Sequence, residues 1–297
     1  DGDGRQEIVY GSATIDDDGS LLYSSFDELS AGSAAPGEQA RLGHGDAMHV
    51  TDIVPDREGL EIFSVHEGGA SAPYGWALRD AATGEVLDGE YSGKDTGRGM
   101  IGDVDPERAG LEYWAAMPPG SDGYREGLGT NQSIRWSADM TTQIVEGYND
   151  EDVRIVDGSG EVLLEAEGTR SNNTTKGNPS LVADVLGDWR EELLVRSADS
   201  SEIQIHLSTE VTDRKLTTLM HDAQYRPEVA RQNTAYNQPS YTEYMLASDI
   251  DWQDVPVYTT EVVAPAPTFV ERPGRGQDGY RVPEVEGVSY YVDGERV

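Results

Sequence analysis

The sequence predicts an all-β fold built from repeated antiparallel units, and three observations support this prediction. One segment type recurs at least four times: a small acidic loop ends in Glu, and that Glu opens an apolar strand. A repeated unit of this kind must stack on its neighbours to bury its apolar face. The 34 glycines among 297 residues indicate many turns between short strands. Helical periodicity is almost absent; the only modest candidate is 223–232, and Pro227 argues against a helix there.

The spacing of the acidic loops indicates the size of the repeated unit. Asp52 and Asp103 lie 51 residues apart, and the next comparable loop, at Asp184, follows 81 residues later. A period near 50 residues is typical of one four-stranded propeller blade. We therefore expect β-propeller blades over residues 1–254. Because the chain opens on Asp1 inside a loop motif, we expect this propeller to be incomplete at its N-terminus.

The segments between the loops have the pattern of β-hairpins. A strand at 60–66 is followed by a strand at 76–80, and a glycine turn then leads into a strand at 85–87. The same pattern recurs over 153–164, with a weaker copy over 134–145. Each repeat therefore contains antiparallel strands joined by short turns.

The C-terminal stretch 255–297 differs in composition from the rest of the chain. It carries five prolines and alternating, strand-like residues such as those at 258–263. Proline cannot donate to the hydrogen-bond ladder of a sheet, so it is confined to edges and strand ends. We expect a closing edge strand followed by a loosely packed proline-rich tail, or the start of another segment.

The charge balance is extreme. The chain has 56 acidic and 22 basic residues, a formal net charge of -34, and only three of the basic residues are lysine. Such a surface repels itself in dilute buffer and is tolerated where salt screens it, so we expect a protein of a halophilic organism. The alternative is a chain that holds many Ca²⁺ ions.

The same composition excludes several classes of partner. The chain has too few cations to neutralise a row of phosphates, which argues against a nucleic-acid partner. No run of about 18 apolar residues is present, so we expect no membrane span. The chain has no cysteine and therefore no disulfide bond. We expect a secreted monomer.

The acidic loops are candidate calcium sites. Spaced Asp oxygens, a Gly that permits the turn and a closing carboxylate suit a hard, oxygen-seeking cation such as Ca²⁺. We expect a structural role, because a cation that binds only the folded state stabilises it. Five histidines without HxxxH or HxH spacing argue against a zinc centre. The candidate metal ligands are Asp1, Asp3, Glu7, Asp52, Glu61, His66, Glu67, Asp103, Asp105, Glu112, Asp184 and Glu192.

A basic residue followed by Gly precedes three of the predicted inner strands. These basic residues are His44, Arg98 and Lys176. The innermost strands of a propeller begin around its central channel, so we expect the three side chains to converge at one rim. Lysine is almost absent elsewhere, which makes simple solvation a poor explanation. The alternative is that each side chain pairs with a local carboxylate and holds its loop.

Seven sequence runs carry a resemblance to a known family. The runs are 42–49, 65–67, 97–99, 171–176, 186–192, 219–226 and 232–239. In this order, from Asp1 to about Leu246, they resemble the rhamnogalacturonan lyases of polysaccharide lyase family 11. The resemblance implies an eight-bladed propeller, of which this chain covers roughly the later five blades, with several bound Ca²⁺ ions. It also implies cleavage of the rhamnose–galacturonate backbone of pectin, with rhamnogalacturonan I as the partner.

The resemblance also implies which residues contact the substrate. The chain lacks the N-terminal β-domain and early blades of the family, and it has Thr where the family turn usually has Gly, at Thr174. The substrate-binding candidates are Asn173, Thr174, Thr175, Asn233 and His44, and the catalytic candidates are Lys176, Arg98 and Tyr236.

β-Elimination at a uronate assigns roles to the catalytic candidates. Arg98 is suited to neutralise the uronate carboxylate, because a planar guanidinium grips it through two hydrogen bonds and keeps its charge. Lys176 is the candidate base if Arg98 and partial burial depress its pKa. Tyr236 is the candidate acid, and the roles of Lys176 and Tyr236 are exchangeable. A Ca²⁺ ion near the rim would share the task of Arg98.

Two other functions are compatible with the sequence. One is a non-catalytic, calcium-stabilised propeller that binds acidic polysaccharide or protein. The other is a glycoside hydrolase with paired carboxylates, although nothing singles out such a pair among the 56 acidic residues. The rim of basic residues favours the lyase.

Overall fold

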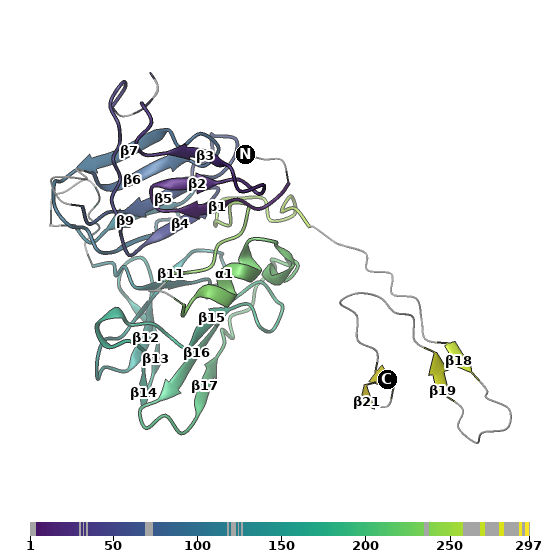
Figure 1. Ribbon diagram of the computed structural model, residues 1–297. Coiled ribbons are helices and arrows are strands. Elements are labelled where there is room, and N and C mark those ends of the chain that lie inside the picture. Colours follow the sequence, from purple (N-terminus) through teal and green to yellow (C-terminus); the bar gives the residue numbers. More distant parts are fainter. Residues whose placement is uncertain are drawn as a thin grey trace. The chain divides into compact units, whose positions relative to one another are not determined.

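The computed structural model describes residues 4–29, 31, 33, 35–68, 74–117, 119, 123, 125, 127–234 and 238–257, with four short strands beyond them. The chain forms two compact units, Asp1–Val257 and Tyr258–Val297 (Figure 1). The predicted boundary at residue 254 is close to this division. The candidate residues Asp1, Asp3 and Tyr236 lie outside the described residues, as does the predicted strand at 258–263.

Short antiparallel strands make up most of the regular secondary structure of the first unit. They form the sheets β1–β3, β4–β7, β8–β9 and β10–β13, and a further sheet in which β16 pairs with β14, β15 and β17. The strands are β1 (Ile8–Tyr10), β2 (Ala13–Ile15), β3 (Leu21–Ser24), β4 (Met48–Thr51), β5 (Glu61–Val65), β6 (Tyr74–Asp80), β7 (Val86–Tyr91), β8 (Gly99–Gly102), β9 (Glu112–Ala115), β10 (Gln132–Ile134), β11 (Gln143–Glu146), β12 (Val153–Val156), β13 (Val162–Ala166), β14 (Thr169–Arg170), β15 (Leu181–Ala183), β16 (Glu192–Ser197) and β17 (Ile203–His206).

The second unit contains two hairpins. Strand β18 (Thr268–Val270) pairs with β19 (Gly279–Arg281), and β20 (Tyr291–Val292) pairs with β21 (Glu295–Arg296). The prediction of a mostly β fold with antiparallel sheets is therefore confirmed. No helix among the described residues has both the length and the apolar character needed to cross a membrane.

The predicted hairpins are present. Strands β5, β6 and β7 pair in chain order, and so do β10, β11, β12 and β13. The turn between β6 and β7 needs Gly84, whose φ of +74° is strained for a residue with a side chain. A Cβ atom there would also lie 2.2 Å from the ring of Tyr23. Glycine is thus required in this turn both by conformation and by packing.

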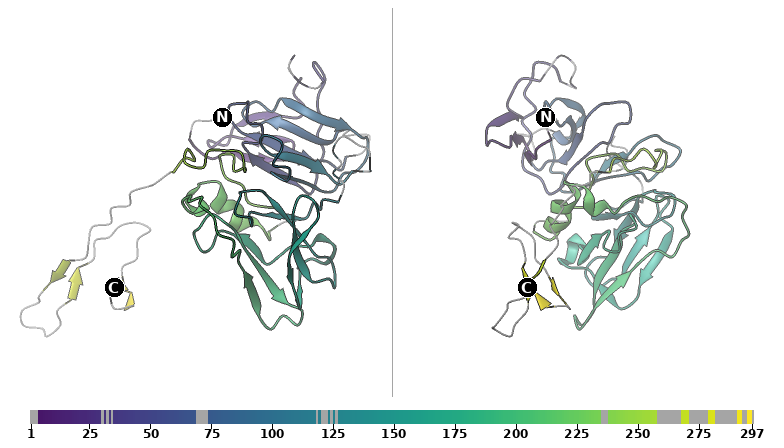
Figure 2. Two further views of the ribbon diagram at one scale, coloured as in Figure 1. Left: turned by 180° about the vertical axis from the view of Figure 1, so that it is seen from behind. Right: turned by 90° about the vertical axis from the view of Figure 1, so that its right-hand side faces the viewer.

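One helical prediction was wrong. The sequence analysis rejected a helix over 223–232 because of Pro227, but the structure has helix α1 (Tyr225–Arg231), which lies beside β15 (Figures 1 and 2). Pro227 is in the first turn of α1, where a backbone N–H has no intrahelical partner to lose. The buried ring of Tyr225 then anchors the helix. Two 3₁₀ turns, η2 (Thr174–Lys176) and η3 (Leu219–His221), complete the helical elements in the described residues.

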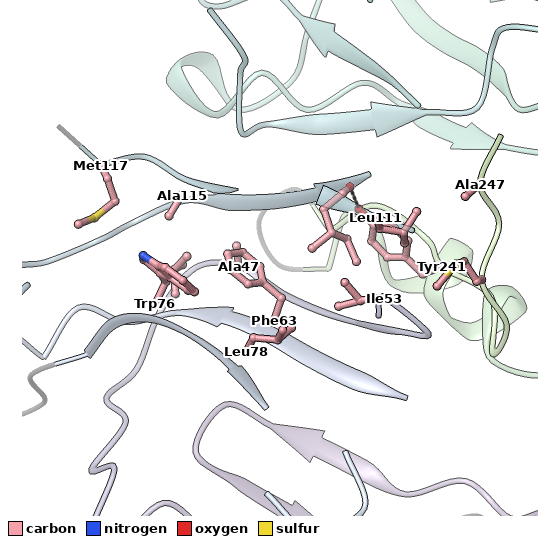
Figure 3. Close-up of a cluster of buried hydrophobic side chains, with 13 residues drawn as sticks. Ala47, Ile53, Phe63, Trp76, Leu78, Leu111, Ala115, Met117, Tyr241 and Ala247 are labelled. Atoms are coloured by element: carbon pink, nitrogen blue, oxygen red, sulfur yellow. Dashed lines mark hydrogen bonds between the residues drawn. The ribbon is translucent and has the colours of Figure 1, made fainter. Parts of the chain in front are cut away.

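A nearly buried segment, 238–247, crosses the first unit without forming a strand or helix. Figure 3 shows its residues Tyr241 and Ala247 in one apolar cluster with Phe63 and Trp76 of the β4–β7 sheet. Burial of each large apolar side chain contributes about 1.5–3 kcal/mol. Side chains from several elements also satisfy the backbone carbonyls of this segment. These hydrogen bonds run from Thr51 Oγ1 to Thr242 O (2.8 Å), from Arg135 Nη1 to Ser240 O (3.2 Å) and from Gln224 Nε2 to Tyr241 O (3.2 Å).

The closing Glu of each acidic loop has a structural role within the loop. In three loops its Oε2 accepts hydrogen bonds from two consecutive backbone N–H groups. At distances of 2.9–3.1 Å, Glu61 accepts from Ile53 and Val54, Glu112 accepts from Val104 and Asp105, and Glu192 accepts from Val185 and Leu186. The recurring motif is therefore a loop closed by one carboxylate, which explains why Glu stands at the start of each strand.

Replacing Glu192 by Ala should lower the free energy of unfolding by roughly 2–5 kcal/mol, because two loop N–H groups lose an ionised acceptor. Glu192→Gln keeps one acceptor oxygen and should cost less. Urea denaturation followed by circular dichroism measures both variants. Glu165→Ala, at an exposed position in β13, is the control and should change stability by about 0.5 kcal/mol or less. An equal loss in Glu192→Ala and in this control would contradict the role of Glu192.

Candidate functional site

The backbone around Arg98 is fixed by contacts from three strands. Arg98 directly precedes β8, and its carbonyl accepts a hydrogen bond from the N–H of Ala116 at 2.8 Å. His49 Nε2 donates to the carbonyl of Gly99 at 3.0 Å. A Cβ atom at Gly99 would lie 2.6 Å from the side chain of Val65, so only glycine fits there. Burial lowers the pKa of His49 to about 4, so its ring is neutral near pH 7 and keeps the Nε2 proton that it donates.

Lys176 is placed by the 3₁₀ turn η2. Asn173 before the turn and Gly177 after it both have left-handed backbone, with φ values of 56° and 63°. These bends direct the chain so that Lys176 Nζ reaches Asp46 Oδ2 at 3.0 Å. The two side chains are only 28% and 18% exposed, so this ion pair is partly shielded from water.

The guanidinium of Arg98 reaches the η2 turn. Its Nη2 donates to the backbone carbonyl of Lys176 at 3.3 Å and to Asn131 Oδ1 at 3.1 Å. Arg98 therefore connects the β8–β9 sheet, the start of the β10–β13 sheet and the turn that carries Lys176. The structure brings the Arg98 side chain to the backbone of Lys176, while the Lys176 amine lies on Asp46; the convergence of the basic side chains at one rim stays a prediction.

His44 lies beside the same cluster. Its Nδ1 is 3.4 Å from Glu67 Oε2, and the N–H of Glu67 donates to the carbonyl of His44 at 2.7 Å. A Cβ atom at Gly97 would lie 3.0 Å from Glu67 Oε1, so Glu67 also borders the Arg98 turn. His44 and Lys176 each pair with a carboxylate, as the alternative interpretation proposed. One interpretation placed the basic residues together at one rim, and the other paired each with a carboxylate; each describes part of this site.

The remaining substrate-binding candidates lie on the η2 turn and at the end of α1. Asn173, Thr174 and Thr175 are exposed on the η2 turn. Asn233 Nδ2 donates to the carbonyl of Ser180 at 2.7 Å, which holds the end of α1 near the strand that follows Lys176. With Tyr236 outside the described residues, its predicted role as acid stays a prediction.

Sequence reasoning missed three residues of this cluster: Asp46, Asn131 and Gln238. Gln238 Nε2 donates to the carbonyl of Asp46 at 2.7 Å, and its Oε1 accepts from the N–H of Met48 at 3.3 Å. Asp46 follows His44 by two residues, and Gln238 belongs to one of the recognised runs, so both carried a signal. Asn131 carried none, because only the folded chain places it beside Arg98.

The predicted metal ligands fit a cation unequally. Both ring nitrogens of His66 already have partners, Ser64 Oγ at 3.0 Å and the carbonyl of Gly43 at 2.9 Å. Both oxygens of Asp184 accept hydrogen bonds, two each. Within the described residues, no three His, Asp or Glu side chains lie close enough together to hold a metal ion without other ligands. His66 and Asp184, whose polar atoms already have hydrogen-bond partners, therefore give the least support to the calcium prediction.

Asp52 and Asp103 fit a cation better. Each has one buried oxygen, Oδ1, without a hydrogen-bond partner among the described residues. Burial and the neighbouring Glu61 carboxylate raise the pKa of Asp52 to about 6. Burial also raises the pKa of Asp103. An oxygen-seeking cation would reduce the repulsion between the carboxylates in each loop. The loops that begin at Asp52 and Asp103 are therefore compatible with Ca²⁺.

Comparisons with known proteins identify relatives of this chain. A family model described as "Rhamnogalacturonan lyase family 11, C-terminal domain" matches residues 1–256. The rhamnogalacturonan exolyase YesX of Bacillus subtilis (strain 168) is 42% identical over 270 residues, which cover 84% of this chain and 42% of that protein. The rhamnogalacturonan endolyase YesW of the same organism is 42% identical over 265 residues, which cover 87% of this chain and 40% of that protein.

Solved structures that resemble this chain are also those of rhamnogalacturonan lyases. The crystal structure of exotype rhamnogalacturonan lyase YesX matches with a TM-score of 0.73 at 41% identity, over 84% of this chain and 42% of that chain. A rhamnogalacturonan lyase PL11 of Bacillus licheniformis matches with a TM-score of 0.72 at 41% identity, over 87% of this chain and 43% of that chain. The chain spans about two fifths of the length of these relatives.

Replacing Thr174 by Gly should stabilise the chain. Thr174 has a φ of 41°, a conformation that is strained for a β-branched residue and that glycine adopts readily. Relief of this strain outweighs the entropy that glycine adds to the unfolded chain, so we expect a gain of about 0.5–1 kcal/mol. Urea denaturation measures it. The neighbouring exposed Thr175 has no positive φ, so Thr175→Gly should be destabilising. A Thr174→Gly variant that is less stable than the unaltered chain would disprove the strain.

Proposed function

Because the chain belongs to rhamnogalacturonan lyase family 11, we propose that it cleaves the backbone of rhamnogalacturonan I by β-elimination. The relatives named rhamnogalacturonan exolyase and endolyase support the substrate class. One observation carries the proposal at the level of residues: Arg98 Nη2 lies 3.3 Å from the carbonyl of Lys176. On this proposal, sheets such as β4–β7 and β10–β13 are blades of the eight-bladed propeller expected for the family.

The reaction makes three chemical demands. The galacturonate carboxylate must be neutralised so that the C5 proton becomes acidic, a base must remove that proton, and the O4 leaving group must be protonated. Arg98 meets the first demand, because its charge is permanent and its planar group matches a carboxylate. Its partial burial strengthens the attraction relative to a fully exposed arginine.

Lys176 is the proposed base. A lysine accepts a proton only as the neutral amine, and Lys176 Nζ lies 3.0 Å from Asp46 Oδ2. In the proposed step the neutral Lys176 amine takes the C5 proton, the bond between C4 and O4 breaks, and Tyr236 gives its proton to O4. Tyr236 is the proposed acid, with the two roles exchangeable.

Calcium is the proposed cofactor. Asp52 and Asp103 offer buried oxygens without a hydrogen-bond partner among the described residues to such an ion. Bound near the rim, Ca²⁺ would supply Lewis-acid neutralisation of the uronate carboxylate; bound in the loops, it would supply stability. The position of Asp52 and Asp103 in the acidic loops favours the structural role.

The lyase proposal predicts an ultraviolet-absorbing product. Incubation of the chain with rhamnogalacturonan I should raise absorbance, because β-elimination leaves an unsaturated uronate. Arg98→Ala and Lys176→Ala should each lower turnover by about 10²–10⁴-fold. Lys176→Arg keeps the charge but cannot act as a base, so it should retain binding and lose turnover. Lys94→Ala, at an exposed lysine, is the matched control and should behave as the unaltered chain does.

The same assay separates the alternatives. New reducing ends without absorbance would identify a hydrolase and refute the lyase. Binding of the polysaccharide with neither product would identify a non-catalytic module. Normal turnover in Arg98→Ala would show that the proposed carboxylate site is wrong.

Calcium removal tests the cofactor. Dialysis against a chelator should lower the melting temperature if Ca²⁺ binds the folded chain, and added Ca²⁺ should restore it. Asp52→Asn with Asp103→Asn removes two proposed ligands, so the melting temperature of this double variant should respond less to Ca²⁺. An identical melting temperature with chelator and with Ca²⁺ in the unaltered chain would contradict a calcium requirement.

A further inference from the structure

Asn131 makes a directional contact with the proposed carboxylate-binding group. It directly precedes β10, and its side chain is almost fully buried, with 4% of the residue exposed. Its Oδ1 accepts a hydrogen bond from Arg98 Nη2 at 3.1 Å. A guanidinium has only donors, so the amide oxygen must be the end that faces Arg98. The orientation of the Asn131 amide is therefore fixed by chemistry.

The other end of this amide is buried and has no partner in the part of the chain that the structure describes. Among the described residues, nothing accepts a hydrogen bond from Asn131 Nδ2. This nitrogen lies 3.0 Å from the position that a Cβ atom at Gly177 would occupy, so Asn131 is packed between Arg98 and the residue after Lys176. An unsatisfied buried donor costs about 1–3 kcal/mol. A leucine would fill this space without that cost, which means that packing alone does not explain an asparagine here.

A neutral acceptor beside Arg98 has a chemical consequence. Some arginines of this chain lie on carboxylates, such as Arg57 on Asp80 at 2.8 Å and Arg231 on Glu228 at 2.7 Å. A carboxylate that pairs with a guanidinium cancels much of its charge for any other anion. The amide of Asn131 fixes the direction of the guanidinium and itself cancels none of its positive charge.

We propose that Asn131 is a positioning residue that aims Arg98 at the carboxylate of galacturonate and makes the site selective for the ionised sugar. The inference rests on the proposed function, because it takes Arg98 as the group that binds the carboxylate. Asn131 itself does not touch the substrate. It acts through Arg98 and holds that side chain against the turn that carries Lys176.

Binding of two matched probes tests this proposal. One probe is a rhamnogalacturonan oligosaccharide with ionised galacturonate, and the other is the same oligosaccharide with its galacturonates methyl-esterified. Calorimetry gives the affinity of the full chain for each probe, and the ratio of the two affinities is the acid preference. A purely structural role for Asn131 would change both affinities together and leave this ratio unchanged.

Three variants sharpen the test. Asn131→Asp adds a negative charge beside Arg98 and should lower the acid preference by about tenfold or more. Asn131→Leu removes the acceptor at similar volume and should lower it by about threefold to tenfold. Asn178→Asp is the control, because Asn178 is equally buried, at 4%, and lies two positions after Lys176, while the described Nη2 bonds of Arg98 go to Asn131 and Lys176; its acid preference should stay within about twofold of the unaltered chain. Thermal unfolding shows which variants are folded.

The outcomes separate this inference from the proposed function. An unaltered chain that prefers the ionised probe but yields no ultraviolet-absorbing product would refute the lyase, while the loss of preference in Asn131→Asp would still support the inference. An acid preference that persists in both Asn131 variants would overturn the inference. An equal loss of affinity for the two probes in these variants would overturn it as well. If the acid preference falls no further in Asn131→Asp than in Asn131→Leu, the argument from charge is overturned. If Asn131→Asp does not fold, the Asn131→Leu ratio decides.

Discussion

A buried backbone without regular secondary structure needs a partner for every polar group, and the segment 238–247 imposes this constraint on the first unit. Polar side chains at the ends of two strands, β4 and β10, provide such partners. Thr51 at the end of β4 donates to Thr242, and buried Arg135 donates to Ser240. Arg135 itself is held by buried Glu191 at 3.6 Å. Residues that look out of place in an apolar core are thus the partners of this segment.

The candidate site lies where the same segment begins. Gln238 is its first residue and donates to the carbonyl of Asp46, whose carboxylate pairs with Lys176. The position of Lys176 therefore depends on a residue about sixty positions later in the chain, and Arg98 adds a second tie to the same turn. Because these ties join separate sheets, the site forms only when the sheets have packed. Its geometry is a consequence of the core rather than of one local loop.

This organisation explains what the sequence could and could not predict. Strand alternation and glycine turns are local, so the hairpins over 60–87 and 153–164 were predictable. The basic residue before each glycine indicated that Arg98 and Lys176 lie together. The helix α1 was missed because the first-turn position of Pro227 depends on where the helix starts. Asn131 was missed because only its contact with Arg98, which is distant in the sequence, singles it out. The closing Glu of the loops suggested a cation, and calcium stays a prediction; spacing alone did not show that in three loops one oxygen of this Glu accepts from two backbone N–H groups.

The net charge of -34 is compatible with the proposed acidic substrate because two electrostatic effects act over different distances. Repulsion from the whole surface is screened within a Debye length, which is about 3 Å in 1 M salt. The contacts of the candidate site are as short as that: 3.0 Å between Lys176 and Asp46, and 3.1 Å between Arg98 and Asn131. Salt that removes the long-range repulsion therefore leaves these contacts largely intact. On the proposed function, recognition of a uronate depends less on total charge than on which atom lies next to each cation, and the proposed role of the Asn131 amide oxygen is to orient Arg98 without adding a negative charge.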